Sequence, residues 1–271
     1  MIDLHLHTTA SDGTDTPAGL VRACCAAGIT TMAVTDHDTT AALPEAAREA
    51  RSAGIAFVPG IEITSVWRGS DVHVLGYFVD PDAPALRLFL DRQIRDRVRR
   101  ARAVGQQLAR FGVVVDMEAL IVRFEGRPLG RPMIADAMVE AGHVAGRDSA
   151  FEAFLGEGRP AYVARQGATP AEAVAVIREA GGMASLAHPG VTRLDDLIPG
   201  LAMAGLDALE VYHGDHSAED TARYLALARQ LGLAVTGGSD YHGAAQKGSD
   251  RFGTIQLPAA DFAMLRGRRR Q

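Results

Sequence analysis

Histidines and acids recur in this sequence beside short apolar segments. His5 and His7 lie two residues apart in an extended segment, a spacing that points both side chains to the same face of a strand. A single buried histidine is usually a hydrogen-bonded core residue. Here so many histidines lie in or beside predicted strands that placement by chance is a poor explanation. The candidates for a joint metal site are His5, His7, Asp12, His37, Glu62, His73, His188, Asp240 and His242.

The donor types narrow the class of ion. Imidazole and carboxylate without thiolate suit manganese, zinc or iron, whereas calcium and magnesium prefer shells made of oxygen. The candidates are too many for one tetrahedral ion, so we expect two or three divalent ions with a bridging carboxylate. Clustered cations of this type bind a phosphate, generate hydroxide at neutral pH and stabilise the attacking and leaving oxygens. The sequence therefore predicts a multinuclear hydrolytic centre.

Alternating strands and helices must position these residues. The segments typical of strands are residues 1–6, 31–35, 56–58, 71–77, 183–187, 208–211 and 233–236. Helical patterns at residues 17–28, 41–54, 192–205 and 218–232 lie between them, which favours parallel strands with crossover helices, in an open sheet or a barrel. Most candidates stand at or just past the carboxyl end of a strand, where α/β folds build their sites, and His73 lies inside one.

The pattern changes in the middle of the chain. Residues 86–111 form a long, arginine-rich helical pattern, and shorter helical patterns follow at 116–123, 132–141 and 149–155. We therefore predict one α/β domain formed by residues 1–80 and 168–271, with a helical insertion subdomain at residues 81–167.

Composition excludes several classes of partner. The formal net charge of −5 argues against duplex nucleic acid, and the basic run at residues 266–270 is expected to be a frayed, solvated tail. We find neither a leader pattern nor an apolar stretch of about 18 residues, so no membrane partner is expected. Cys24 and Cys25 are adjacent, which disfavours a disulfide and fits buried thiols in a reducing cytoplasm. A monomer is favoured.

Four motifs resemble those of a known family. His5-Leu6-His7 through Gly13, Thr35 through Asp38, His188-Pro189, and Gly238 through His242 are similar, in order and in residue type, to the motifs of the PHP (polymerase and histidinol phosphatase) family. The match spans nearly the whole chain. Gly60-Ile61-Glu62, Gly130-Arg131-Pro132 and Glu210-Val211-Tyr212 resemble the branch that hydrolyses nucleoside 3′,5′-bisphosphates, some members of which trim short oligoribonucleotides from the 5′ end.

The resemblance implies a distorted seven-stranded (β/α)7 barrel that carries a trinuclear site. One ion would take His5, His7, Glu62 and Asp240. A second would share Glu62 and add His73 and His188, and a third would take Asp12, His37 and His242. Asp12 stands where some members use histidine, which could change the metal preference or the occupancy of the third site.

Several further residues are candidates for contacting the substrate. Arg131 could clamp a phosphate, because a guanidinium fork fits phosphate oxygens, although a structural role at a helix start is the alternative. His213 and His216 could donate a proton, and His216 could also bind substrate; the alternative is a pair of loop histidines. Asp38 could orient His37 or cap the following helix. For Arg159 and Arg165 a solvated surface position is favoured over phosphate contact.

The favoured reaction is hydrolysis of a phosphomonoester by in-line attack at phosphorus, converting a nucleoside 3′,5′-bisphosphate to the 5′-monophosphate. One alternative within the family is histidinol-phosphate phosphatase. Another, of a different class, is a non-catalytic metal-binding module related to polymerase PHP domains, against which the full ligand set argues. An amidohydrolase would use a modified lysine as a bridge, but Lys247 follows the last motif and Glu62 fits that role better.

Overall fold

The computed structural model describes residues 1–246 and 248–269. It divides into two compact units, Met1–Phe89 with Ala168–Gln271, and Leu90–Gly167. The second unit begins at Leu90, whereas the sequence suggested residue 81 as the start of the insertion. Lys247, and Arg270 of the basic tail, lie outside the described residues.

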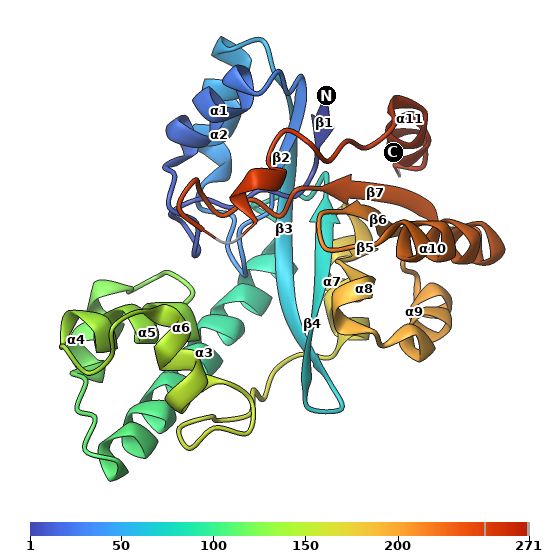
Figure 1. Ribbon diagram of the computed structural model, residues 1–271. Helices are drawn as coiled ribbons and strands as arrows, with labels where there is room; N and C mark the ends of the chain where they lie inside the picture. Colours follow the sequence, from blue (N-terminus) through green and yellow to red (C-terminus); the bar gives the residue numbers. More distant parts are fainter. Residues whose placement is uncertain (247, 270–271) are drawn as a thin grey trace. The chain divides into compact units, whose positions relative to one another are not determined.

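The first unit is built on a seven-stranded sheet whose strands follow one another in chain order (Figure 1). The strands are β1 (Ile2–Asp3), β2 (Thr31–Val34), β3 (Ala56–Trp67), β4 (Ser70–Tyr77), β5 (Met183–Leu186), β6 (Ala208–His213) and β7 (Ala234–Gly238). The expected strands are thus present, with shifted ends. The first strand is much shorter than residues 1–6, because the chain after Asp3 leaves β2 and follows the segment after β7.

Hydrogen bonds along a seam nearly close this sheet into a barrel. The Leu4 N–H donates to the Gly237 carbonyl at 3.1 Å, and the Asp240 N–H donates to the His5 carbonyl at 3.0 Å. The Asp3 carboxylate accepts from the N–H groups of His5 (3.2 Å) and Ser239 (3.0 Å). These contacts join the two ends of the sheet, which confirms the predicted distorted α/β barrel.

The hairpin of β3 and β4 corrects the expectation of parallel strands throughout. β4 is antiparallel to both β3 and β5. Arg68 and Gly69 have φ angles of 50° and 87°, which suit a tight hairpin turn and leave no room for a crossover helix. β3 also runs far beyond residue 58, so Glu62 lies inside this strand and not after it.

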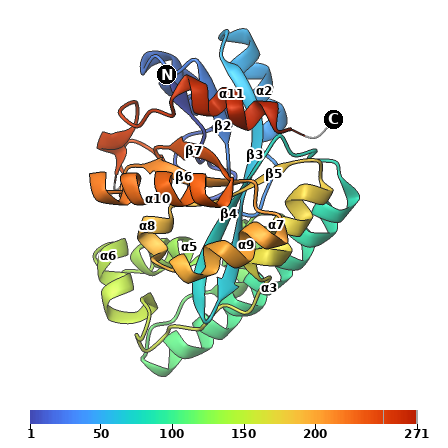
Figure 2. The same cartoon turned by 90° about the vertical axis from the view of Figure 1, so that its right-hand side faces the viewer.

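Helices pack around the sheet of the first unit, and α10 and α11 lie beside β6 and β7 (Figure 2). These helices are α1 (Pro17–Ala26), α2 (Leu43–Ser52), α7 (Pro170–Glu179), α8 (Pro189–Thr192), α9 (Ile198–Ala204), α10 (Ala218–Leu231) and α11 (Ala259–Gly267), with short turns η2 (Asp195–Leu197) and η3 (Ser249–Arg251). Caps fix several of their starts, as at α1, where Thr16 accepts from the Gly19 N–H.

Two helical predictions need correction. The expected helix at residues 192–205 is broken into α8, η2 and α9, because Arg193 adopts a left-handed φ of 52°. The basic tail is not wholly frayed, since α11 extends through Arg266 to Gly267. Among the described helices, none combines the length and the apolar character required to cross a bilayer.

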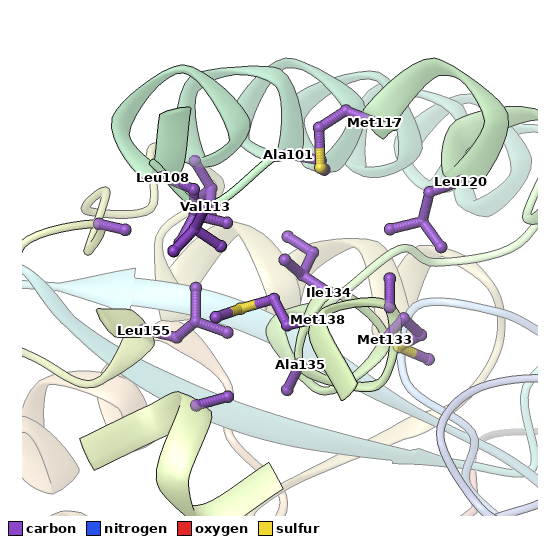
Figure 3. Packing of buried hydrophobic residues seen from close by; sticks show 14 of the residues in the cluster. Ala101, Leu108, Val113, Met117, Leu120, Met133, Ile134, Ala135, Met138 and Leu155 are labelled. Atoms are coloured by element: carbon purple, nitrogen blue, oxygen red, sulfur yellow. The ribbon is translucent and has the colours of Figure 1, made fainter. Parts of the chain in front are cut away.

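The second unit is helical and has a hydrophobic core of its own. Its helices are the greater part of α3 (Pro84–Arg110), then α4 (Met117–Arg123), α5 (Arg131–Glu140), α6 (Arg147–Ala150) and the π-helical turn η1 (Phe151–Leu155). Side chains from each of these helices meet in the core, among them Leu108, Met138 and Leu155 (Figure 3).

Asp3 gives a test of the barrel seam. Burial raises the pKa of its carboxyl to about 6, although hydrogen bonds from Ser239 and His5 act in the opposite direction. The folded protein therefore binds the proton more tightly than the unfolded chain does. The contribution of Asp3 to stability falls by about 3 kcal/mol as the pH rises from the unfolded pKa of 3.8 to the folded pKa of about 6. Asp3→Asn keeps an acceptor but cannot ionise. We expect its free energy of unfolding to rise relative to that of the wild type between about pH 4 and pH 7, because the wild type loses stability between the unfolded pKa of 3.8 and the folded pKa of about 6.

Urea unfolding in the presence of chelator measures this difference. Asp3→Ala serves as the control, because it removes the acceptor and should be destabilised at both pH values. A difference between Asp3→Asn and wild type that does not change with pH would show that Asp3 is not protonated in the folded protein.

Candidate metal centre

Glu62 lies at the centre of the predicted site. Its backbone is fixed by the segment after β2, since its carbonyl accepts from the Asp38 N–H at 2.9 Å and its own N–H donates to the Asp36 carbonyl at 3.2 Å. Both carboxylate oxygens face imidazoles. Oε2 lies 3.1 Å from Nε2 of His5, 3.2 Å from Nε2 of His7 and 3.3 Å from Nδ1 of His37, while Oε1 lies 2.8 Å from Nδ1 of His73 and 3.3 Å from Nε2 of His188. A carboxylate with different ring nitrogens on each oxygen suits a bridging ligand.

Asp240 forms a second carboxylate face beside Glu62. Its Oδ1 lies 3.2 Å from Nε2 of His5 and 3.1 Å from Nε2 of His7. Its backbone adopts a left-handed φ of 55°, which is uncommon for a residue other than glycine. The seam hydrogen bond to His5 holds this conformation, so barrel closure positions the carboxylate.

Asp12 and His242 form the third face. Asp12 Oδ1 lies 3.3 Å from Nε2 of His242, and Asp12 Oδ2 lies 3.9 Å from Nε2 of His37. The loop that carries Asp12 folds tightly against His7, because a Cβ atom at Gly13 would lie 2.7 Å from the His7 carbonyl carbon. The buried Asp36 carboxylate anchors the start of this loop by accepting from Thr8 N–H, Thr8 Oγ1 and Ser11 Oγ.

The ligand atoms group in a way that fits divalent cations. Four overlapping sets have donor atoms within 4.8 Å of one another: His5, His7, Glu62 and Asp240; His7, Asp12, His37 and His242; His37, Glu62 and His73; and His5, Glu210 and His213. Within the described residues, both ring nitrogens of His7 and Oδ1 of Asp12 are buried and make no hydrogen bond of good geometry, although charged groups lie 3.1–4.0 Å away. Buried polar atoms are normally paired, so these atoms are better explained as ligands of a cation.

The charges of the cluster are mutually dependent. Burial alone would raise the pKa of the Glu62 carboxyl, but the imidazoles of His37, His5 and His73 outweigh burial and hold that pKa well below its usual value. Conversely, burial would lower the pKa of His5, but Glu210, Asp240 and Glu62 raise it well above 6.5. Because the pKa of His5 is raised, its ring must lose a proton before Nε2 can bind a divalent ion.

A cavity of about 190 Å³ opens onto the cluster. Its lining residues are His37, Glu62, His73, His188, Val191, His213, Asp215 and Asp240. His213, which the sequence suggested as a proton donor, lies at this cavity. Its Nδ1 accepts from the Asp215 N–H at 3.1 Å, and its Nε2 lies 3.6 Å from Oδ2 of Asp240.

His216 is engaged with the backbone on both sides of its ring. Nδ1 donates to the Val211 carbonyl at 2.8 Å and Nε2 accepts from the Gly190 N–H at 3.1 Å, and burial lowers its pKa. In this arrangement the ring is neutral and its one N–H is bound by a backbone carbonyl. His213 differs, because its Nδ1 accepts an amide and its ring N–H is then at Nε2, which lies at the cavity.

Arg131 lies in the second unit, at the first position of α5. Its Nη1 donates to the Leu155 carbonyl at 3.3 Å, and its guanidinium lies over the rings of Phe151 (5.7 Å) and Tyr162 (5.5 Å). Arg131 lines a small pocket together with Arg97, Arg100 and Arg165. Arg165 is therefore one of a group of arginines, whereas Arg159 is exposed.

Sequence reasoning missed the role of two buried acids. Asp38 does not cap the following helix, because α2 begins at Leu43 and Oδ1 of Asp38 instead accepts from the Thr64 N–H of β3 at 2.9 Å. Glu210 was noted only as part of a motif, yet its carboxylate lies 2.9 Å from Nδ1 of His5. A charged residue inside the apolar strand segment at residues 208–211 was the signal available in the sequence.

Comparisons with known proteins agree with this geometry. A profile of the PHP domain matches residues 3–107. The 5′-3′ exoribonuclease Rnm of Salmonella typhimurium is 37% identical over 247 residues, which cover 89% of this chain and 84% of the relative. A 3′,5′-nucleoside bisphosphate phosphatase of Chromobacterium violaceum is 36% identical over 264 residues, which cover 95% of this chain and 92% of the relative. A solved structure from Bifidobacterium adolescentis, of a protein regarded as a metal-dependent phosphoesterase, has a TM-score of 0.89 at 30% identity and covers 99% of this chain and 96% of its own.

The central position of Glu62 predicts unequal effects of two conservative substitutions. Glu62→Gln keeps the size of the side chain but removes the charge shared by five imidazoles, so we expect it to lose most of the bound metal. Asp12→Asn affects only one edge of the cluster and should lose about one ion. Metal content after manganese loading and gel filtration, measured by mass spectrometry, checks this order, with circular dichroism as the control for folding. Equal losses in the two variants would contradict a bridging role for Glu62.

Proposed function

This chain belongs to the PHP domain family of metal-dependent phosphoesterases, and from this premise we propose that it removes the 3′-phosphate of a nucleoside 3′,5′-bisphosphate. The products would be a nucleoside 5′-monophosphate and inorganic phosphate, with water as the co-substrate. The observation that carries the proposal is the carboxylate of Glu62, buried among five imidazoles at the end of the barrel. The names of two relatives support the substrate class, and short oligoribonucleotides are the second candidate.

We propose three ions, held as the family resemblance implies. His5, His7, Glu62 and Asp240 would hold the first; Glu62, His73 and His188 the second; and Asp12, His37 and His242 the third. When bound, divalent ions at these positions supply positive charge to the phosphate oxygens and lower the pKa of the attacking water. Manganese, zinc and iron remain the candidates on the grounds of donor chemistry.

His213 is proposed to contact the transferred phosphate. Because its Nδ1 accepts the Asp215 amide, the ring proton resides on Nε2, at the cavity. From there the N–H can donate to an oxygen that gains charge in the transition state. His216 is proposed to hold the Gly190 and Val211 backbones in place, and its predicted contact with substrate stays a prediction.

Arg131 is proposed to bind a phosphate of the substrate. Its guanidinium is kept in place by aromatic rings and by the Leu155 carbonyl, and it belongs to a group of four arginines around one pocket. Guanidinium groups fixed in this way suit the second phosphate group, which a bisphosphate has and a simple phosphomonoester lacks. Histidinol phosphate has one phosphate and would gain less from such a group.

The remaining predictions concern the state of the protein in the cell. Both cysteines carry free thiols. Cys24 is buried as expected, but Cys25 is exposed, so the expectation of a buried thiol is wrong for Cys25. The absence of a bond between these two cysteines supports the proposal of a reducing, cytoplasmic location. A monomer stays the favoured state, and sedimentation of the purified protein would test it.

The role of Arg131 predicts a substrate-dependent effect. Arg131→Ala should lower kcat/KM for adenosine 3′,5′-bisphosphate by about 10- to 100-fold, because a charge-assisted hydrogen bond is lost, and should affect adenosine 3′-monophosphate much less. Steady-state assays of phosphate release with manganese measure both substrates, with Arg159→Ala as the exposed control. Histidinol phosphate and a 5′-phosphorylated oligoribonucleotide complete the panel. Preference for histidinol phosphate would overturn the proposed function.

The role of His213 can be tested with two substitutions. His213→Ala should lower kcat by about 100-fold, as expected for the loss of a hydrogen bond formed in the transition state. His213→Gln retains an N–H donor and should recover part of that loss, with the pH profile of the wild type. If the two variants are equally inactive and both lose one limb of the pH–rate profile, then His213 transfers a proton and the hydrogen-bond assignment is wrong.

A further inference from the structure

Glu210 is a buried carboxylate behind the metal centre that connects two of the predicted ligands. Glu210 lies in β6 and is fully buried. Oε1 accepts from Nδ1–H of His5 at 2.9 Å, while Oε2 accepts from the backbone N–H of His188 at 2.8 Å. Each oxygen thus serves a residue from a different part of the barrel, and the two residues belong to different proposed metal positions.

The contact with His5 decides which ring nitrogen can bind a cation. A carboxylate beside Nδ1 keeps a proton on that nitrogen, and the lone pair of the neutral ring is then on Nε2. Nε2 of His5 faces Oε2 of Glu62 at 3.1 Å and Oδ1 of Asp240 at 3.2 Å. The tautomer that Glu210 selects is therefore the one that presents a ligand to the cluster.

The contact with His188 stabilises an uncommon backbone conformation. His188 has φ 28° and ψ 57°, in the left-handed region that residues other than glycine rarely adopt. Such a conformation persists only where the surroundings determine it, and the Glu210 carboxylate gives the His188 N–H a charged acceptor. In this conformation Nε2 of His188 reaches Oε1 of Glu62 at 3.3 Å.

We infer that Glu210 is a positioning residue that fixes the ligating nitrogen of His5 and the backbone of His188 at the same time, and so sets the metal affinity of the site. The inference rests on the proposed metal-dependent function. The competing role is direct ligation, since Glu210, His5 and His213 also have donor atoms within 4.8 Å of one another. The two roles differ in their effect on metal stoichiometry.

Glu210→Gln tests the inference with little change in volume. A glutamine has one carbonyl oxygen, so it cannot accept from both His5 and His188. Its NH2 group would either oppose the His188 N–H or donate to Nδ1 of His5 and so reverse the tautomer. Titration calorimetry with manganese alone should show affinity about 10- to 100-fold weaker than wild type, with the number of ions unchanged at saturation.

Thr236→Val is the matched control. Thr236 pairs with Glu210 across β6 and β7 and is fully buried, and its hydroxyl lies 2.8 Å from Oγ of Ser185. We expect this variant to lower the free energy of unfolding and to leave manganese affinity as in wild type. An equal loss of affinity in both variants would mean that the effect is merely structural.

The tautomer of His5 can be measured in the wild type, so this test does not require a variant to fold. In the zinc-loaded wild type, nitrogen NMR should show His5 protonated at Nδ1, and the reverse tautomer would overturn the inference. Loss of one whole ion in Glu210→Gln, with the affinity for the others unchanged, would identify Glu210 as a ligand and also overturn it. If the wild type binds neither manganese nor zinc, the proposed metal-dependent function is wrong. If Glu210→Gln binds manganese as tightly as the wild type, only the positioning role of Glu210 is wrong.

Discussion

A carboxylate without contact to solvent must be compensated by positive charge or hydrogen bonds, and the Glu62 carboxylate meets this condition through imidazoles that come from different parts of the chain. His5 and His7 follow β1, His37 follows β2, His73 lies in β4 and His188 follows β5. No single segment could supply this set. The barrel brings the ends of its strands together at one rim, so the fold is the means by which a buried charge becomes a binding site for cations.

The antiparallel hairpin of β3 and β4 is the departure from a regular β/α barrel that this site requires. A crossover helix after β3 would carry the chain away from the rim. The tight turn after Trp67 instead returns the chain directly as β4, which runs antiparallel beside β3. His73 in β4 is paired with Thr64, two residues from Glu62 in β3. Side chains two residues apart on a strand share one face, so the hairpin places the acid and the histidine on the same side of the sheet.

The order of the strands and the set of candidate ligands could be predicted from the sequence, because short apolar segments ending in histidine or acid are visible without any structure. The length of β3 could not, since Pro59 and Gly60 are residues typical of strand ends. The left-handed conformations of His188 and Asp240 were also hidden, because they depend on tertiary contacts with Glu210 and with the His5 carbonyl. Arg131 remains the opposite case: its neighbours are now known, while its role is still inferred from chemistry.

The seam between the first and last strands has a consequence for how the protein matures. His5 precedes Asp240 in the chain by 235 residues, and His7 precedes His242 by the same distance. A ligand set with such large separation in sequence has a high contact order and forms late in folding. A partly synthesised or partly folded chain therefore holds only fragments of the cation site. The complete set of candidate ligands is therefore brought together only when the two ends of the sheet have joined.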